Sequence, residues 1–324
     1  MKLRVGTRRS PLALTQTRQT MDALVALRPG TEIELVEITT TGDRITDRPL
    51  REAGGKGLFL KELDEALQDG RIDCAVHSMK DVPTDLADGT TIATVLARAD
   101  PRDVLVTAAG HDLSSLPATT VAGTTSLRRQ AQVLAVCPSA SIRLLRGNVE
   151  TRIRKLESGD CDATFLAAAG LGRLGIDATR PGFRVRGVVL DPFEFVPAPG
   201  QGTIAVTARA DDDATIHLLL ALEHHDSRVA ATAERAFARV FGGGCHLPLA
   251  AFSHVSEGRV RLVGLLISPD GTSVVRDESD AALDRDPSDF VVADALGTAL
   301  GQSFFDRGAA AILAAADAAA GVAS

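Results

Sequence analysis

The sequence predicts an α/β fold in two lobes, followed by a smaller α+β domain. Short apolar runs alternate with amphipathic stretches through the first two-thirds of the chain, which is typical of strands alternating with helices. Two proline-bearing segments interrupt this alternation, and the last third changes to strands joined by short turns. The 324 residues exceed what one hydrophobic core usually serves, so two or three domains are expected.

Apolar and β-branched runs predict the strands of the two lobes at 3–7, 33–38, 73–77, 91–97, 104–107, 142–145, 164–168 and 203–208. Amphipathic stretches predict helices at 11–27, 58–67, 126–136, 149–156 and 214–222. The first helix has a clear start signal, because Ser10 can cap its N-terminus and Pro11 takes the first helical position.

The segments RADPRDV (98–104) and FVPAPGQG (195–202) are interpreted as crossings between the lobes. The first domain would then comprise residues 1–98 and 199–219, and the second residues 99–198, with a hinge and a cleft between them. Ligands of open α/β sheets bind at the carboxyl ends of strands, next to helix N-termini.

Residues 220–324 are expected to form the third, α+β domain. A helix within DSRVAATAERAFARVF comes first, and a long helix near 290–305 follows the strands. The strands are expected in LAAFSHV, RVRLVGLLIS and TSVVRDE, joined by turns at SEG and PDG.

Composition excludes several classes of protein. The net charge of −7 argues against a general nucleic-acid binder. No apolar run reaches the roughly 18 residues of a membrane span, and the N-terminal MKLRVGTRRSPLAL has no apolar signal region. The four cysteines form no CxxC pair, which argues against a metal site or a disulfide framework and favours the cytoplasm. No apolar seam is visible, so a monomer is expected.

Arginines collect at predicted strand-to-helix corners. They occur in GTRRSP, GTTSLRRQ, LLRGNVETR and GLGRLG, and the residues concerned are Arg8, Ser10, Thr124, Ser126, Arg128, Arg129, Arg146, Arg152 and Arg173. Helix N-termini attract anions, and guanidinium groups bind carboxylates through paired hydrogen bonds. These corners, each interpreted as a helix start, predict a cleft that binds a polyanion, although single surface arginines are usually only solvated.

The stretch HSMKDVP follows the predicted strand 73–77 and places Ser78, Lys80 and Asp81 at its carboxyl end. Lys80 and Asp81 could be a simple surface ion pair. Facing a cleft of arginines, Asp81 would instead stay ionised and could stabilise a developing cation or move a proton. His77 is interpreted as a strand residue with a satisfied ring.

Two other motifs have competing interpretations. Three glycines run into Cys245 in VFGGGCHLP, so its thiol could be an attachment point, a nucleophile, or an ordinary half-buried side chain. GLGRLG matches the dinucleotide-binding pattern GxGxxG. Pro181 and Gly182 interrupt the helix that this pattern requires, which disfavours a dehydrogenase.

The motifs TRRSPLAL, GGKGLFLKEL, DCAVHSMKDVP, GTTSLRRQ, LRGNVETR, PGQG and GGGCHLP occur in an order that resembles the hydroxymethylbilane synthase (porphobilinogen deaminase) family over nearly the whole chain. The resemblance implies two hinged, periplasmic-binding-protein-like α/β domains and a small C-terminal α+β domain. It implies a transferase of tetrapyrrole and heme biosynthesis, which adds four porphobilinogen units to a dipyrromethane cofactor, releases ammonia at each addition, and frees hydroxymethylbilane by hydrolysis.

The resemblance also implies roles for individual residues. Cys245 would hold the dipyrromethane through a thioether, and Asp81 would be the catalytic carboxylate. The cofactor carboxylates would be held by Ser78, Lys80, Thr124, Ser126, Arg128 and Arg129. Substrate contacts would come from Arg8, Ser10, Lys56, Phe59, Arg146, Arg152, Arg173 and Gln201. A hand-off of the product to uroporphyrinogen-III synthase is conceivable.

The chain departs from the family pattern in three places. Glu52 stands where some relatives have lysine, Gly242 replaces a more usual acidic residue, and segment 177–195 is longer than expected. The main rival hypothesis is a two-lobed polyanion-binding protein without chemistry, and a dehydrogenase is the second. A third domain carrying Cys245 and the absence of a signal sequence disfavour a simple periplasmic binder.

Overall fold

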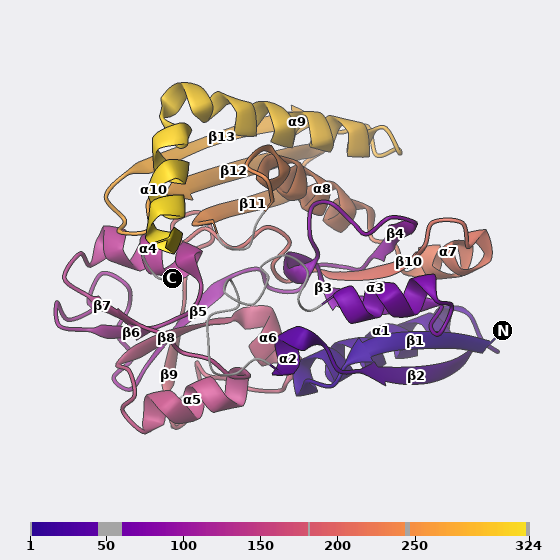
Figure 1. Cartoon of the computed structure of the whole chain (residues 1–324), viewed down its shortest axis with the longest axis horizontal. Coiled ribbons are helices and arrows are strands. Elements are labelled where there is room, and N and C mark those ends of the chain that lie inside the picture. The colour runs from indigo at the N-terminus through magenta and orange to yellow at the C-terminus, as the bar shows by residue number, and fades with distance from the viewer. Residues whose placement is uncertain (1, 45–59, 181, 244–246, 322–324) are drawn as a thin grey trace.

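The computed structural model describes residues 2–44, 60–180, 182–243 and 247–321, and its strands form three separate sheets (Figure 1). Two five-stranded sheets with helices form the two lobes, and a three-stranded antiparallel sheet belongs to the C-terminal part. The predicted fold class is therefore confirmed.

The first sheet has the strand order β2-β1-β3-β10-β4. β1 pairs in parallel with β2 and β3, whereas β10 pairs antiparallel with β3 and β4. Ser10 accepts a hydrogen bond from Ala13 N at 3.3 Å and so caps α1 as predicted. The strands are β1 (Lys2–Arg8), β2 (Glu32–Ile38), β3 (Cys74–Ser78), β4 (Thr90–Val95) and β10 (Ile204–Arg209), and the helices α1 (Pro11–Leu27), α2 (Thr41–Arg44), α3 (Lys61–Gln68) and α7 (Asp213–Leu219).

The second sheet has the order β7-β6-β8-β5-β9. β6 pairs in parallel with β7 and β8, and β5 pairs antiparallel with β8 and β9. β6 and β9 were not among the predicted strands. The strands are β5 (Asp103–Thr107), β6 (Val121–Gly123), β7 (Ser141–Arg143), β8 (Ala163–Ala167) and β9 (Arg186–Val189), and the helices α4 (Leu127–Val136), α5 (Val149–Glu157) and α6 (Ala168–Arg173).

The two sheets share one topology. In each sheet, the fourth strand of the order is antiparallel to its neighbours. The chain enters this strand directly from a crossing between the lobes, because β5 follows the first crossing (98–104) and β10 follows the return crossing (195–202). This repetition confirms two α/β lobes of one topology, although the sequence shows no repeat. It also supports the division into 1–98 with 199–219, 99–198 and 220–324, whose boundaries stay a prediction.

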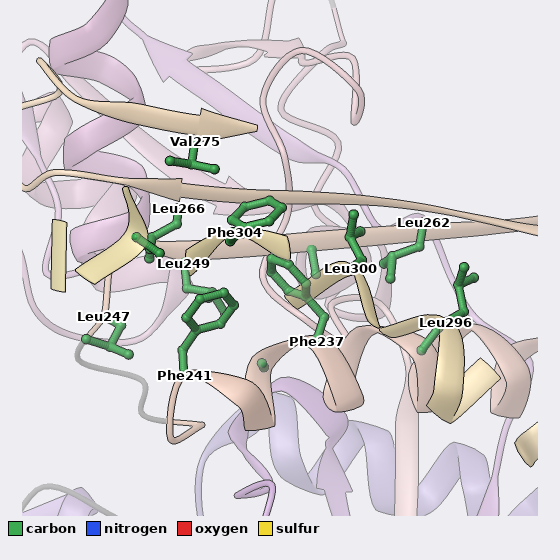
Figure 2. Close-up of a cluster of buried hydrophobic side chains, with 14 of the residues drawn as sticks. Phe237, Phe241, Leu247, Leu249, Leu262, Leu266, Val275, Leu296, Leu300 and Phe304 are labelled. Carbon is green, nitrogen blue, oxygen red and sulfur yellow. The ribbon is translucent and has the colours of Figure 1, made fainter. Parts of the chain in front are cut away.

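The third domain packs α8 (His225–Val240), α9 (Asp289–Ser303) and α10 (Ala309–Gly321) on the sheet of β11 (Leu249–Ser256), β12 (Arg259–Ile267) and β13 (Val274–Ala282). Figure 2 shows its core, in which Phe237, Phe241 and Phe304 meet edge to face. Gly297 lets α9 approach α8, because a Cβ there would lie 2.1 Å from Ala233 O. No helix in the described ranges is long and apolar enough to cross a bilayer.

Candidate active site

Lys80 and Asp81 lie in a single 3-10 turn, Met79–Asp81, directly after β3. The backbone is held there because Met79 N donates to Thr203 O at 3.0 Å, beside the return crossing. Ser78 ends the strand, and its Oγ accepts from Gln16 Nε2 of α1 at 2.9 Å. Among the described residues, the Asp81 carboxylate has neither a hydrogen bond nor an ion pair, so the surface pair with Lys80 is absent there.

Gln201 links both crossings to the Lys80 turn. Its Oε1 accepts from Lys80 Nζ at 3.3 Å, and its Nε2 donates to Pro101 O at 2.8 Å. Burial, together with the charges of Arg129 and Arg128, lowers the pKa of Lys80 to about 8, although Asp81 and Asp103 act in the opposite direction. The glutamine is itself buried. It therefore connects the first lobe to both chain segments that lead to the second.

Arg128 and Arg129 converge on Asp103 at the start of β5, and all three side chains are buried. Arg129 Nη2 lies 2.6 Å from Asp103 Oδ1, and Arg128 Nη1 lies 2.8 Å from Oδ2. Burial alone would raise the pKa of Asp103, but the two guanidinium groups hold it well below its usual range. One carboxylate cannot neutralise two guanidiniums, so positive charge is left over.

Arg152 adds to this charge from α5. Its Nε donates to Gly147 O at 2.9 Å, and burial, together with Arg129 and Arg146, lowers its pKa to about 10. Repulsion of this kind means that the arginines of α4, α5 and the loop before α5 lie near one another. Lys80 shares the neighbourhood, since Arg129 and Arg128 both depress its pKa. Clustered cations with insufficient carboxylate form a site for a polyanion.

The hydroxyl groups predicted at the start of α4 are in place. Ser126 caps the helix by accepting from Arg129 N at 3.4 Å, and Thr124 Oγ1 accepts from Ser126 N at 3.1 Å. Thr124 is buried. The N-terminus of α4 thus adds its dipole to the site.

The interpretation of Arg173 as a helix-start residue is wrong. Arg173 is the last residue of α6, and its Nη2 donates to Gly202 O of the return crossing at 2.7 Å. The GLGRLG motif begins inside α6, a helix of six residues, and the described residues that follow its glycines form no dinucleotide-binding helix. Arg8 ends β1 and Ser10 opens α1, as predicted. α1 faces α6, where Leu12 Cδ2 is 3.6 Å from a Cβ placed on Gly170.

The third domain contacts the Asp81 loop directly. Arg235 of α8 donates from Nη1 to Val82 O at 2.8 Å and from Nη2 to Pro83 O at 2.7 Å. Gly243 has φ +62°, and a Cβ there would lie 1.9 Å from Thr84 Oγ1. The glycine turn before Cys245 therefore packs against the loop that carries Asp81. Cys245, Lys56 and Phe59 themselves lie outside the described residues, as does Glu52.

Sequence reasoning missed Glu234, which joins three parts of the chain while fully buried. Its carboxylate accepts from Arg98 Nη1 at 2.6 Å, from Gly200 N at 2.6 Å and from Ser253 N at 2.6 Å. Both crossings are thereby attached to α8. A signal was present, because helical spacing places Glu234 on the same apolar face as Ala230 and Phe237. Asp103 had no such signal within DVLVT.

Two minor expectations are resolved by the packing. His77 is buried in β3, and its Nε2 lies 2.9 Å from Thr207 Oγ1; burial lowers its pKa to about 4, which keeps the ring neutral. In segment 177–195, Arg184 pairs with Glu150 and Glu157 of α5, and Phe193 packs edge-on against Phe252 of the third domain. This segment thus contacts both α5 and the third sheet, and its greater length stays an expectation.

Comparison with known proteins agrees with this geometry. Residues 3–217 match the family described as porphobilinogen deaminase, dipyromethane cofactor binding domain, and residues 228–305 match porphobilinogen deaminase, C-terminal domain. The chain is 45% identical over 314 residues to the porphobilinogen deaminase of Chromobacterium violaceum, covering 97% of each chain. It is 46% identical over 313 residues to that of Shouchella clausii, covering 96% of each.

Similar solved structures include the VFT2 domain of BvgS from Bordetella pertussis. That domain aligns with a TM-score of 0.44 at 16% identity, over 68% of this chain and 86% of its own.

A two-lobed α/β body with buried cations at the junction of its lobes is the arrangement expected for the class of proteins that hold a polyanionic ligand between two lobes. The family matches specify the chemistry done there. The chain belongs to the porphobilinogen deaminase family. It is a transferase of porphyrin biosynthesis with a domain that binds dipyrromethane, and the dehydrogenase hypothesis is set aside.

Proposed function

We propose that the chain holds its dipyrromethane by a thioether to Cys245 and adds porphobilinogen units to it one at a time at the junction of the lobes. Each of four additions releases ammonia, and water then frees hydroxymethylbilane. The observation that carries this proposal is the surplus of buried positive charge around Asp103, beside a carboxylate, Asp81, that has no partner among the described residues.

The residues present fit the cofactor. Each of its pyrrole rings carries an acetate and a propionate, so the group brings four carboxylates that need cationic partners. Lys80, Arg128 and Arg129 supply these cations, and Ser78, Thr124 and Ser126 supply hydroxyl groups at a strand end and a helix N-terminus. When bound, the cofactor provides the free pyrrole position to which substrate is joined.

Cys245 is the proposed anchor because of what surrounds the glycine turn. Phe241 and Leu247 on either side belong to the third-domain core, and Figure 2 shows both pointing into it. Gly243 packs against Thr84, three residues after Asp81. The dipyrromethane must stay fixed at one end while units are added at the other. An attachment point between two core residues, beside the loop that carries Asp81, suits this requirement.

Asp81 is the proposed catalytic carboxylate. Loss of ammonia from the substrate leaves positive charge on a pyrrole nitrogen, and an ionised carboxylate facing that N–H stabilises the charge. The same carboxylate can take up the proton that leaves when the new carbon–carbon bond has formed. The 3-10 turn fixes Asp81 next to Lys80, so the acid and the cation act from one short segment.

The substrate carboxylates are assigned to the remaining polar groups. Arg146 and Arg152 lie next to the cofactor arginines, whereas Arg173 and Gln201 line the return crossing. Arg8 and Ser10 lie where β1 meets α1. Lys56 and Phe59 complete the set by family resemblance alone.

The test is the intact mass of the purified protein under denaturing conditions, beside Cys245→Ser. We expect an excess equal to two linked pyrrole units in the wild type and none in the variant. Buried Cys137→Ser is the matched control and should keep the excess. A wild-type chain that gains no mass, even after incubation with porphobilinogen, would leave the polyanion-binding protein as the better hypothesis.

The same proposal includes a cytoplasmic location, a monomeric state and a hand-off of product to uroporphyrinogen-III synthase. Cys74, Cys137 and Cys161 are free buried thiols, which suits a reducing compartment. Porphobilinogen is the proposed small-molecule substrate, and neither nucleic acid nor membrane is expected as a partner. Size-exclusion chromatography with light scattering tests the monomer.

A further inference from the structure

Helix α4, which carries Arg128 and Arg129, is held from two sides. On its inner side, Arg129 pairs with Asp103 and Gln132 Nε2 donates to Val196 O at 3.0 Å. Its outer side lies next to the end of the third sheet (Figure 1). The arginines are therefore placed by contacts from the second lobe and from the third domain together.

The outer contact is made by the turn between β12 and β13, through Gly271. A Cβ on Gly271 would lie 2.5 Å from Ala135 N and 2.8 Å from Ala131 O, both backbone atoms of α4. Backbone cannot turn aside as a flexible side chain can, so the distance is set by the absence of a side chain. Gln130 Nε2 adds a hydrogen bond to Pro269 O at 3.1 Å.

The β12–β13 turn is held in one conformation by its own hydrogen bonds, so it can limit how closely α4 approaches the third sheet. Asp270 Oδ1 accepts from Thr272 N at 3.1 Å and from Thr272 Oγ1 at 2.9 Å, and it also accepts from Ser268 Oγ. Gly271 N donates to Ser268 O at 2.8 Å, and φ of Gly271 is +76°. Side-chain and backbone bonds together define one conformation.

We propose that the β12–β13 turn is a positioning element for the active site. Through Gly271 it sets where α4 lies, and thereby where Arg128 and Arg129 meet the carboxylates of the cofactor. The inference rests on the function proposed above, because it assigns these two arginines to the cofactor. It gives the third domain a second task besides carrying Cys245.

The expected effect is large for a residue so far from the chemistry. Misplacing a binding group by about 1 Å can cost about a hundredfold in rate. A methyl group on Gly271 must widen the spacing between the turn and α4 by a comparable amount, since the gap of 2.5 Å is well short of van der Waals contact.

The experiment compares Gly271→Ala with Gly258→Ala, each prepared as the full chain. Gly258 lies in the other turn of the same sheet with φ +68°, and a Cβ there would meet only Leu283 O at 3.9 Å. Both variants carry the same backbone strain, so they should lose similar thermal stability from it. Only Gly271→Ala should also lose cofactor, seen by intact mass, or show at least a tenfold rise in KM for porphobilinogen.

Equal cofactor occupancy and equal KM in the two variants would overturn the inference, while turnover by the wild type in the same assay would leave the proposed function standing. If Gly271→Ala does not fold, Gln130→Ala decides. It removes the bond to Pro269 without a clash, and a two- to threefold rise in KM is expected. An unchanged KM in that variant would overturn the inference as well.

Discussion

Replacing Glu234 with glutamine tests whether one buried carboxylate of α8 holds both crossings against the third domain. The change keeps the size of the side chain and removes its charge. Arg98, only 11% exposed at its side chain, then has no anion to face. One carboxylate oxygen also becomes an NH₂ group, which cannot accept from the N–H of Gly200 or Ser253.

The expected loss of unfolding free energy follows from the burial of the Arg98–Glu234 ion pair. Removing one partner of a buried ion pair costs about 3–5 kcal/mol, because the other charge stays in a low-dielectric site. An exposed pair is worth only about 0–1 kcal/mol. The pair of Arg239 with Asp294 is of that kind, with both side chains more than 40% exposed. Asp294→Asn, which removes an exposed partner of the same helix α8, is therefore the matched control.

Urea unfolding followed by far-ultraviolet circular dichroism measures the loss, since the chain has no Trp or Tyr for fluorescence. We expect Glu234→Gln to lower the free energy of unfolding by about 3–5 kcal/mol and Asp294→Asn by less than about 1 kcal/mol. The double variant with Arg98→Met should be less damaged than the sum of the single changes. Equal, small losses for both single variants would refute the reasoning.

Three further predictions concern the chemistry. Asp81→Asn should leave a folded protein that carries cofactor but releases ammonia from porphobilinogen at least a hundredfold more slowly; near-normal release would remove Asp81 from its role. Arg128→Leu should prevent cofactor assembly, and a fully loaded variant by intact mass would contradict that. Lys80, whose pKa is about 8, should lose its charge as the pH rises through 8. The cofactor-free wild type should then gain stability between about pH 8 and the unfolded pKa of 10.5, because only the unfolded chain keeps the proton there, and cofactor-free Lys80→Arg should lack this gain in urea unfolding.

The sequence alone predicted the elements that depend on signals from neighbouring residues. α1 begins where Ser10 and Pro11 predict, and Lys80 and Asp81 follow a buried strand as expected. β6 was missed because three residues, VAG, are too few for a periodic pattern, and it exists only through pairing with β7 and β8.

The missed parts of the site are buried charges. Asp103 and Glu234 have the same chemistry in the sequence as any surface carboxylate, and only the packed structure shows that arginines neutralise them. Arg173 was misplaced for a related reason. Its neighbouring glycines indicate a turn, whereas tertiary contacts with α1 and the return crossing favour a short helix.

The way the chain leaves the first lobe and returns also fixes the order in which the sheets can be completed on the ribosome. β4 has β10 as its partner in the first sheet, so residues 90–95 must wait until 204–209 have been synthesised. The second sheet needs nothing beyond residue 189. The lobe that is begun second can therefore be finished first, and the apolar edges of β3 and β4 stay exposed to chaperones for as long as the second lobe is being made.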